Sequence, residues 1–369
     1  MNINDYLRWR GDIPFKMAPF NDVDNAILSM FSYINWTDIV YPDFPVKVED
    51  AWRRYLVLHP DTDLNKDKFK MMSLCAASDR YDDCWLMNYE REVNKDLETM
   101  FSAITIRLPD RTYFVSFEGT ESSIVGWKED FNMTYMFPVP AQTSAMNYLK
   151  RTYAGRFSRY RLGGHSKGGN LAIYAAVMLE KPDHIISVYN NDGPGFTNEF
   201  LSSYEYQQIK PKIESLIPQA SVIGQLMNND IDEKIIMTST RDMAWQHSVF
   251  SWEVDVDHFL EADKASREGL FFQNALNRWN SEMSVEQKMV FMNTFYDTLV
   301  DLGIKDSRDL LGKKMAVLKA FMNKAARFDD STRRIILDVL KALFQSNISA
   351  FYNTYLDKVV KRYERKQDQ

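Results

Sequence analysis

The spacing of apolar residues along the chain changes character twice. Residues 1–100 follow a mainly helical pattern, and the apolar run 26–33 begins directly after the capping side chains of 21–24. β-Branched and aromatic residues at 103–108 and 112–117 predict a hairpin across the turn at 109–111. Further strand-like segments (158–163, 185–190, 219–226 and 234–240) alternate with helical ones, notably 170–180, which Pro182 ends. This alternation predicts a mostly parallel α/β sheet.

Strand signals disappear from about residue 261 onward. Ser284 to Gln287 form a capping box, and Gly303 marks the end of the long helix that follows. Asp306-Ser307 and Asp330-Ser331 are candidate caps of two more helices, the second continuing through the amphipathic run 333–344. We therefore expect a helical N-terminal segment (1–100) partly covering the core, an α/β core (101–260) and a helical C-terminal region (261–369).

Composition and charge limit the class of protein. The 369 residues are 45% hydrophobic and 26% charged, which is ordinary globular usage. Of the net charge of −6, residues 301–369 contribute +6, from 15 Lys and Arg against 9 Asp and Glu, so residues 1–300 carry −12. Such an acidic body disfavours nucleic-acid binding. The basic tail 358–366 could contact an anionic membrane surface transiently, although a solvated helix end is favoured.

We expect neither a membrane anchor nor a disulfide framework. The sequence contains no apolar run of 18 residues, no signal peptide is expected from residues 1–8, and the two cysteines, Cys75 and Cys84, make no metal set. We expect a soluble cytoplasmic protein. Residues 59–67 begin like a calcium loop but lack its glycine and glutamate, and nucleotide-binding and zinc motifs are missing. The sequence therefore predicts neither a cofactor nor a metal.

Gly164-His-Ser166-Lys-Gly168 is a G-x-S-x-G pattern between a short predicted strand and an Ala-rich helix. In a nucleophile elbow, a sharp strand-to-helix turn exposes the serine, and small residues are needed on both sides because the backbones nearly touch. We therefore expect Ser166 to be a nucleophile. A glycine-rich turn with a bystander serine is the alternative.

A serine nucleophile needs a general base, and only five histidines are available. His59 lies upstream, His165 is expected to point away from the serine, and His184 precedes its strand and so lies at the wrong end of a parallel sheet. His247 follows a strand in an aromatic loop, whereas His258 lies among acids, as at a solvated helix start. We favour His247 over His258 as the base.

The acid that orients the histidine should follow a strand of the sheet. Asp192 follows the strand 185–190 and directly precedes Gly-Pro-Gly195, where it could also be an ordinary turn residue. Asp230, in the run 228–232 that ends at Asp232, is the rival. We favour Asp192.

An oxyanion hole requires two hydrogen-bond donors. One is expected to be the backbone amide of Lys167, directly after the nucleophile. The other is expected from Thr120, in the glycine turn Phe117-Glu-Gly-Thr120-Glu-Ser-Ser123 that closes a predicted strand. The alternative for this turn is a polar hairpin exit.

These motifs carry a resemblance to a known family. Residues 117–130 and 164–169 resemble the oxyanion segment and elbow of class 3 lipases. The chain is more similar still to a family of bacterial lipase-like α/β-hydrolases defined as a domain of unknown function. The similar pieces are 5–12 with 20–24, 164–172, 191–195, 221–224 and 246–252. At the position where class 3 lipases carry their acid, this chain has Ser221, which cannot serve as the acid. We therefore assign the acid to Asp192, after the preceding strand, where some other lipases carry theirs.

The resemblance implies an α/β-hydrolase fold and a serine hydrolase that cleaves carboxylic or lipid-like esters with Ser166, His247 and Asp192. The expected partner is a small-molecule or lipid ester substrate. A catalytically silent hydrolase fold that serves as a binding protein is the alternative from another class.

Overall fold

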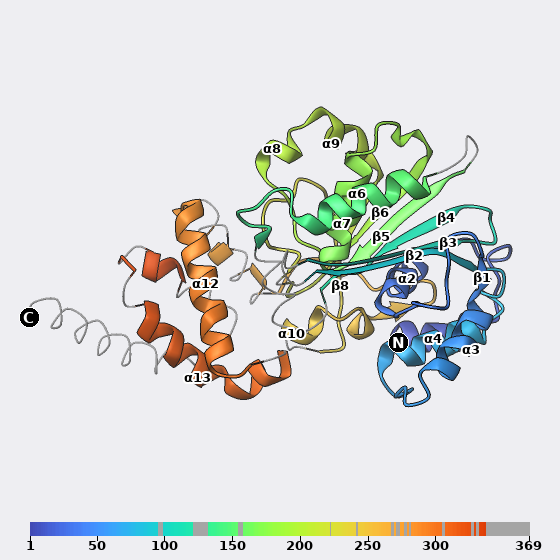
Figure 1. Ribbon diagram of the computed structural model, residues 1–369, viewed down its shortest axis with the longest axis horizontal. Helices are drawn as coiled ribbons and strands as arrows, with labels where there is room; N and C mark the ends of the chain where they lie inside the picture. The colour runs from blue at the N-terminus through green and yellow to red at the C-terminus, as the bar shows by residue number, and fades with distance from the viewer. Residues whose placement is uncertain are drawn as a thin grey trace, which may run out of the picture. The chain divides into compact units, whose positions relative to one another are not determined.

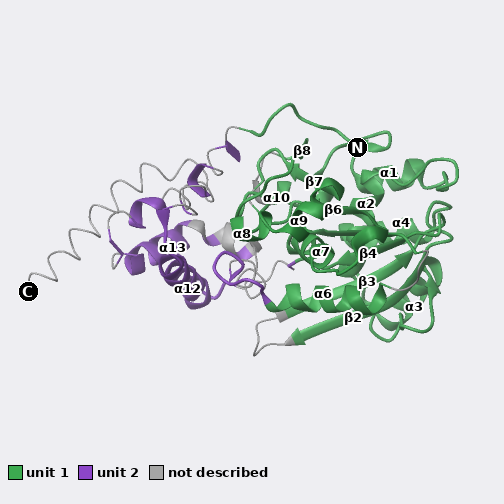
Figure 2. Ribbon diagram, turned by 90° about the horizontal axis from the view of Figure 1, so that it is seen from above, with its two compact units in different colours: residues 1–119, 140–266 green, residues 120–139, 267–369 purple. Residues whose placement is uncertain are grey.

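A computed structural model gives the arrangement of most of the chain. It describes residues 1–94, 99–120, 132–153, 158–221, 223–240, 243–266, 269–270, 274–276, 279, 282–304, 307–325, 328–329 and 332–336. The chain forms two compact units (Figure 2). Unit 1 comprises Met1–Gly119 and Pro140–Ser266, and unit 2 comprises Thr120–Val139 and Arg267–Gln369. The N-terminal segment 1–100 thus belongs to the same unit as the sheet.

Unit 1 is built on a mixed sheet, which has eight strands in the described part of the chain and runs in sequence order from β1 to β8. Strands β1 to β4 pair antiparallel, and β4 to β8 pair parallel. The β3–β4 pair confirms the predicted hairpin, and the parallel half confirms the α/β prediction. The strands are β1 Val46–Lys47, β2 Trp85–Asn94, β3 Thr99–Arg107, β4 Tyr113–Phe117, β5 Tyr160–His165, β6 Ile185–Asn191, β7 Ile213–Pro218 and β8 Glu233–Ile236.

Helices cover both faces of this sheet (Figure 1). On one face α6 (Pro140–Thr152) and α7 (Lys167–Val177) pack over β3 to β6, together with α8 (Asn198–Leu201) and α9 (Tyr204–Ile209). On the other face lie α1 (Ile3–Arg10), α2 (Asp22–Ser29), α3 (Val48–Leu58) and α4 (Asp67–Ala76). Because both faces are covered, the central parallel strands β5 and β6 are buried at all but one position each.

The sequence-based prediction for residues 1–100 missed a strand. Strand β2 pairs with β3 over its whole length, with a bulge between Met87 and Glu90 where Asn88 has a positive φ of 53°. Its outer half carries Glu90, Arg91 and Glu92, which obscure the apolar alternation expected of a half-buried strand. Pairing with β3, rather than local pattern, determines this element.

The strand predicted at 219–226 is also misplaced. The strand itself is β7, Ile213–Pro218, and it ends where the prediction begins. Among the described residues of 219–226 the backbone turns, and the amide of Gly224 donates to a side chain of the candidate site described below. The strand predicted at 219–226 is therefore wrong for its described residues.

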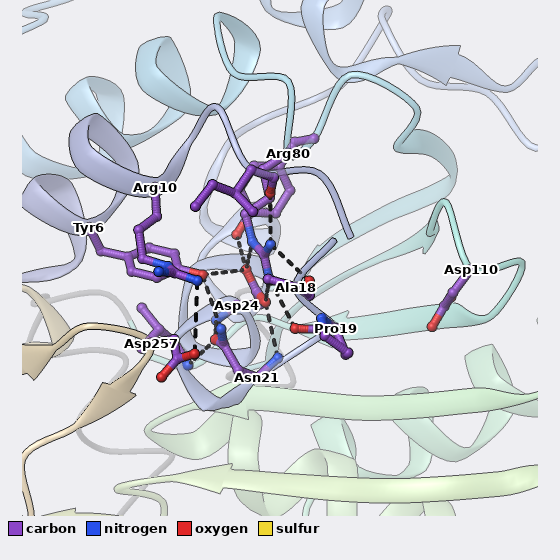
Figure 3. Close-up of polar contacts among 12 residues, drawn as sticks. Tyr6, Arg10, Ala18, Pro19, Asn21, Asp24, Arg80, Asp110 and Asp257 are labelled. Carbon is purple, nitrogen blue, oxygen red and sulfur yellow. Dashed lines mark hydrogen bonds and ion pairs between the residues drawn. The ribbon is translucent and has the colours of Figure 1, made fainter. Parts of the chain in front are cut away.

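A buried ion pair connects helix α2 to the turn that precedes β2 (Figure 3). Arg80 and Asp24 are both fully buried, and the guanidinium Nη2 lies 2.5 Å from Asp24 Oδ2. Arg80 Nε donates to Asp24 Oδ1 at 2.7 Å, and Nη1 and Nη2 also reach the carbonyl oxygens of Ile13, Ala18 and Pro19. The hydroxyl of Tyr81 donates to the same carboxylate at 2.7 Å. Such pairing satisfies charges that would otherwise be costly in the interior.

Unit 2 contains the helices predicted for the C-terminal region. Helix α12 (Val285–Asp301) begins at a capping box of Ser284 and Gln287, as predicted, and Gly303 follows it with a positive φ of 62°. Helix α13 spans Ser307–Ala325, and Phe321 packs edge-on against Phe291. The predicted caps at Asp306 and 330–331, the helix beyond residue 336 and the tail 358–366 lie outside the described residues.

Candidate active site

Ser166 lies in a sharp turn between β5 and α7. Its φ of 58° and ψ of −136° place a non-glycine residue in a strained backbone region. A Cβ on Gly164 would lie 2.3 Å from the carbonyl carbon of Gly168, and one on Gly168 would lie 2.1 Å from the carbonyl oxygen of Phe117. Larger residues cannot occupy either position, which is the steric requirement of a nucleophile elbow.

Asp192 emerges beside Ser166 at the same edge of the sheet. His165 and Asn191 are paired residues at the ends of β5 and β6, so the next residue of each strand leaves the sheet side by side. The Ser166 amide donates to the Asn191 carbonyl at 2.9 Å. The Asp192 side chain is fully buried, and its Oδ1 accepts from the Ser221 hydroxyl at 2.5 Å and from the Gly224 amide at 3.1 Å.

His247 follows the short helix α10 (Met243–Gln246) and reaches the second oxygen of this carboxylate. Its Nδ1 lies 2.6 Å from Asp192 Oδ2, and its side chain keeps 24% of its surface exposed. Because a carboxylate accepts, Nδ1 carries the proton and Nε2 remains an acceptor. Among the described residues, no hydrogen bond joins the Ser166 hydroxyl to His247.

The loop that carries His247 is held by neighbouring side chains. The side-chain amide of Gln246 makes two hydrogen bonds: Oε1 accepts from the Ala220 amide at 2.8 Å, and Nε2 donates to the Thr240 carbonyl at 3.0 Å. The buried Trp252 donates its indole N–H to the Gln246 backbone carbonyl at 3.0 Å. These bonds fix Gln246, the residue directly before the histidine.

The ring of His165 lies against that of His247, with centroids 4.5 Å apart. We expected this side chain to point away from the serine and did not anticipate its contact with His247. Its Nε2 lies 2.6 Å from the His247 carbonyl oxygen. Burial, and then the positive charge that His247 can carry, lower the pKa of His165 from 6.5 to about 3. His165 is therefore neutral and acts as a packing and hydrogen-bonding partner.

The rival residues lie elsewhere. His258 belongs to β10 (His258–Phe259), which pairs with β9 (Val254–Asp255), so the predicted helix start is wrong there, and its side chain is 59% exposed. Asp230 accepts from Tyr206 and Lys210. Burial opposes ionisation of Asp230, but the hydrogen bonds from Lys210 and Tyr206 outweigh it and lower the pKa of its carboxyl. Asp232 is exposed.

The two residues expected to form an oxyanion hole, Lys167 and Thr120, belong to different units. Lys167 is the first residue of α7, where backbone amides lack intrahelical acceptors, and its buried ammonium donates to the Met100 carbonyl at 3.2 Å. Thr120 is the first residue of unit 2. The preceding Gly119 lies against the elbow, since a Cβ on it would be 3.0 Å from the Ser166 Cβ. The segment 121–130 lies outside the described residues.

The remaining chemistry of the described residues is limited. Within the described ranges, no group of three or more His, Cys, Asp or Glu side chains is placed to hold a metal ion. In the same part of the chain, no helix is sufficiently long and apolar to cross a bilayer. The sheet and the elbow together define a lipase-like α/β-hydrolase fold, with a mostly parallel sheet and helices on both faces.

Comparison with known proteins places the chain in a family. It belongs to the Mbeg1-like family, whose model matches residues 75–297, more than half of the chain. No curated protein matches the sequence. Among solved structures, a lipase–propeptide complex of Rhizomucor miehei is similar, with 13% identity, a TM-score of 0.34 and coverage of 58% of this chain and 67% of that one. The M37 lipase is similar with 11% identity, a TM-score of 0.34 and coverage of 65% and 83%.

Sequence reasoning overlooked several residues of the site. Ser221 and Gly224 were part of the family resemblance but were not recognised as partners of Asp192. His165 was excluded as a base, and its contact with His247 has no signal in the pattern. Tyr33, whose hydroxyl lies 3.1 Å from the His165 carbonyl oxygen, comes from a distant helical segment and could not have been identified from spacing.

Proposed function

We propose that this protein is a serine hydrolase that cleaves carboxylic esters, including lipid-like esters, through an acyl-enzyme intermediate. Ser166 is the nucleophile, His247 the general base and Asp192 the acid that orients the base. The observation that carries the proposal is the 2.6 Å contact between His247 Nδ1 and Asp192 Oδ2, beside a serine held in a strained elbow.

The arrangement supports acylation by a defined path of protons. The neutral His247 Nε2 takes the proton of the Ser166 hydroxyl while Oγ attacks the ester carbonyl carbon. The Asp192 carboxylate stabilises the imidazolium that forms. His247 then gives the proton to the leaving alkoxide, the carbon–oxygen bond breaks, and the acyl group remains on Ser166. The Ser166–His247 hydrogen bond is expected to form when substrate binds, because such contacts are often long in free enzymes.

Deacylation uses the same groups. A water molecule loses a proton to His247 Nε2 and attacks the acyl carbonyl, and the proton returns to Ser166 Oγ as the acid departs. The negative oxygen of each tetrahedral intermediate would be bound by the backbone amide of Lys167, at the N-terminus of α7, and by Thr120. The dipole of an eleven-residue helix favours negative charge at that end.

Labelling with a fluorophosphonate probe tests the proposal. The wild-type protein should be labelled covalently and should hydrolyse p-nitrophenyl esters, and Ser166→Ala should lose both activities while its thermal unfolding is unchanged. Ser202→Ala, at an exposed serine between α8 and α9, is the matched control and should react like the wild type. Absence of labelling in the wild type would favour a catalytically silent hydrolase fold that serves in binding.

A further inference from the structure

The hydroxyl of Tyr33 connects two loops that converge on the candidate site. Tyr33 ends the short 3₁₀ helix Phe31–Tyr33 of the N-terminal segment, and the residue is buried. Its hydroxyl accepts from the amide of Gly119 at 3.1 Å and lies 3.1 Å from the carbonyl oxygen of His165. One hydroxyl therefore joins the turn after β4 to the nucleophile elbow.

His165 continues this connection to the loop of the base. Its Nε2 lies 2.6 Å from the backbone carbonyl oxygen of His247, and a carbonyl can only accept, so Nε2 carries the hydrogen. In the neutral ring Nδ1 is then an acceptor, and it lies 3.3 Å from the Tyr33 hydroxyl. The Tyr33 proton thus has two acceptors on His165, the ring nitrogen and the carbonyl.

The space around these bonds is closely filled. A Cβ on Gly119 would lie 2.2 Å from the His165 carbonyl oxygen and 2.4 Å from the Tyr33 hydroxyl. The rings of His165 and His247 are in contact as well. A shift of any one of the three loops would therefore break a hydrogen bond or produce a clash, so the loops are constrained together.

We propose that Tyr33 and His165 are positioning residues that hold the Gly119 turn, the Ser166 elbow and the His247 loop in one register. The proposal rests on the proposed hydrolase function. Neither residue carries the reaction itself. They act by keeping His247 Nε2, the Ser166 hydroxyl and the turn beside the oxyanion site in mutual alignment. Misplacement of such groups by about 1 Å can cost about 100-fold in rate.

Two pairs of variants test the role of each side chain. His165→Phe keeps a ring against His247 but removes the Nε2 donor, whereas His165→Gln keeps a donor near the same position. Tyr33→Phe removes only the hydroxyl. Its matched control is Tyr153→Phe. The Tyr153 hydroxyl also accepts from a backbone amide (His184) and donates to a backbone carbonyl (Lys181). These bonds lie before β6 begins, at the opposite end of the sheet from the candidate site.

The expected result is a change in kcat with little change in KM. His165→Phe should lower kcat about 100-fold, and His165→Gln should recover most of that loss, to within about 10-fold of the wild type. Tyr33→Phe should lower kcat about 10-fold or more, and Tyr153→Phe should stay within about twofold. A merely structural role would instead reduce thermal stability in both His165 variants alike, without rescue by glutamine.

Other outcomes separate this inference from the proposed function. If the wild type is labelled at Ser166 and both His165→Phe and Tyr33→Phe react at the wild-type rate, the positioning role is wrong and the hydrolase proposal stands. Equal losses in the phenylalanine and glutamine variants of His165 would also overturn it. If the wild type itself shows neither labelling nor ester hydrolysis, both proposals are wrong. Should His165→Phe fail to fold, the Tyr33→Phe and Tyr153→Phe pair decides the question.

Discussion

The two carboxylate oxygens of Asp192 have different partners, and His247 contacts only one of them. Oδ2 lies 2.6 Å from His247 Nδ1, whereas Oδ1 accepts from the hydroxyl of Ser221 and the amide of Gly224. The carboxylate is fully buried, so these three groups, rather than water, determine its orientation. This orientation selects the tautomer in which His247 Nε2 is free of a proton and can act as a base.

Asp192→Asn should lower turnover by about 10⁴ without unfolding the protein, because the amide no longer selects the correct histidine tautomer. Steady-state hydrolysis of a p-nitrophenyl ester measures the effect. Asp230→Asn is the control, since Asp230 is engaged by Lys210 and Tyr206, and it should remain near wild-type turnover. A larger loss in the Asp230 variant would transfer the role of the acid.

His247→Ala should reduce ester hydrolysis by orders of magnitude, whereas His258→Ala should have little effect, because the exposed His258 belongs to a separate hairpin. Titration with a fluorophosphonate probe gives a second measurement, in which the rate of labelling should follow the same order. The reverse ranking would show that the base has been assigned to the wrong histidine.

His165 should make the native state sensitive to acid. Its pKa is lowered to about 3 in the folded protein, so below pH 6.5 the unfolded chain binds a proton that the native protein does not. Its contribution to stability is therefore complete above pH 6.5 and is lost as the pH falls toward 3, by up to about 1.4 kcal/mol per pH unit. The free energy of unfolding, measured with urea between pH 4 and 7, should change less steeply with pH in His165→Gln than in the wild type. Equal slopes would contradict this prediction.

Asp24→Asn should destabilise the protein by about 3–5 kcal/mol, because the fully buried Arg80 would lose the charge that compensates it. Urea unfolding measures the change. Asp50→Asn is the matched control at an exposed pair with Arg53, where the loss should stay within about 1 kcal/mol. A loss at Asp24 no larger than that at Asp50 would mean that the buried pair contributes no more than a surface pair.

Much of the framework could be predicted from local sequence. The elbow around Ser166 requires glycine at fixed spacing, the β3–β4 hairpin follows from a tight turn between β-branched runs, and the capping box at Ser284 is a local exchange of hydrogen bonds. The expectation that Asp192 would open at the same edge as Ser166 follows from parallel strand order alone. Each of these features depends on neighbours in the chain or on a simple rule of sheet geometry.

What the sequence by itself determined, then, is the fold class, the family resemblance and the residue types of the candidate site. Only the tertiary structure decided that β2 is a strand, that Ser221 and Gly224 bind Asp192, and that Tyr33 and His165 join three loops. Strand β2 pairs with its neighbour β3, but the contacts of the site connect segments far apart in the chain, 29 residues for Ser221 and Asp192 and 132 for Tyr33 and His165. Local patterns of hydrophobic and polar residues carry no record of such contacts, because they arise only when strand pairing and helix packing bring distant backbone atoms within hydrogen-bond distance.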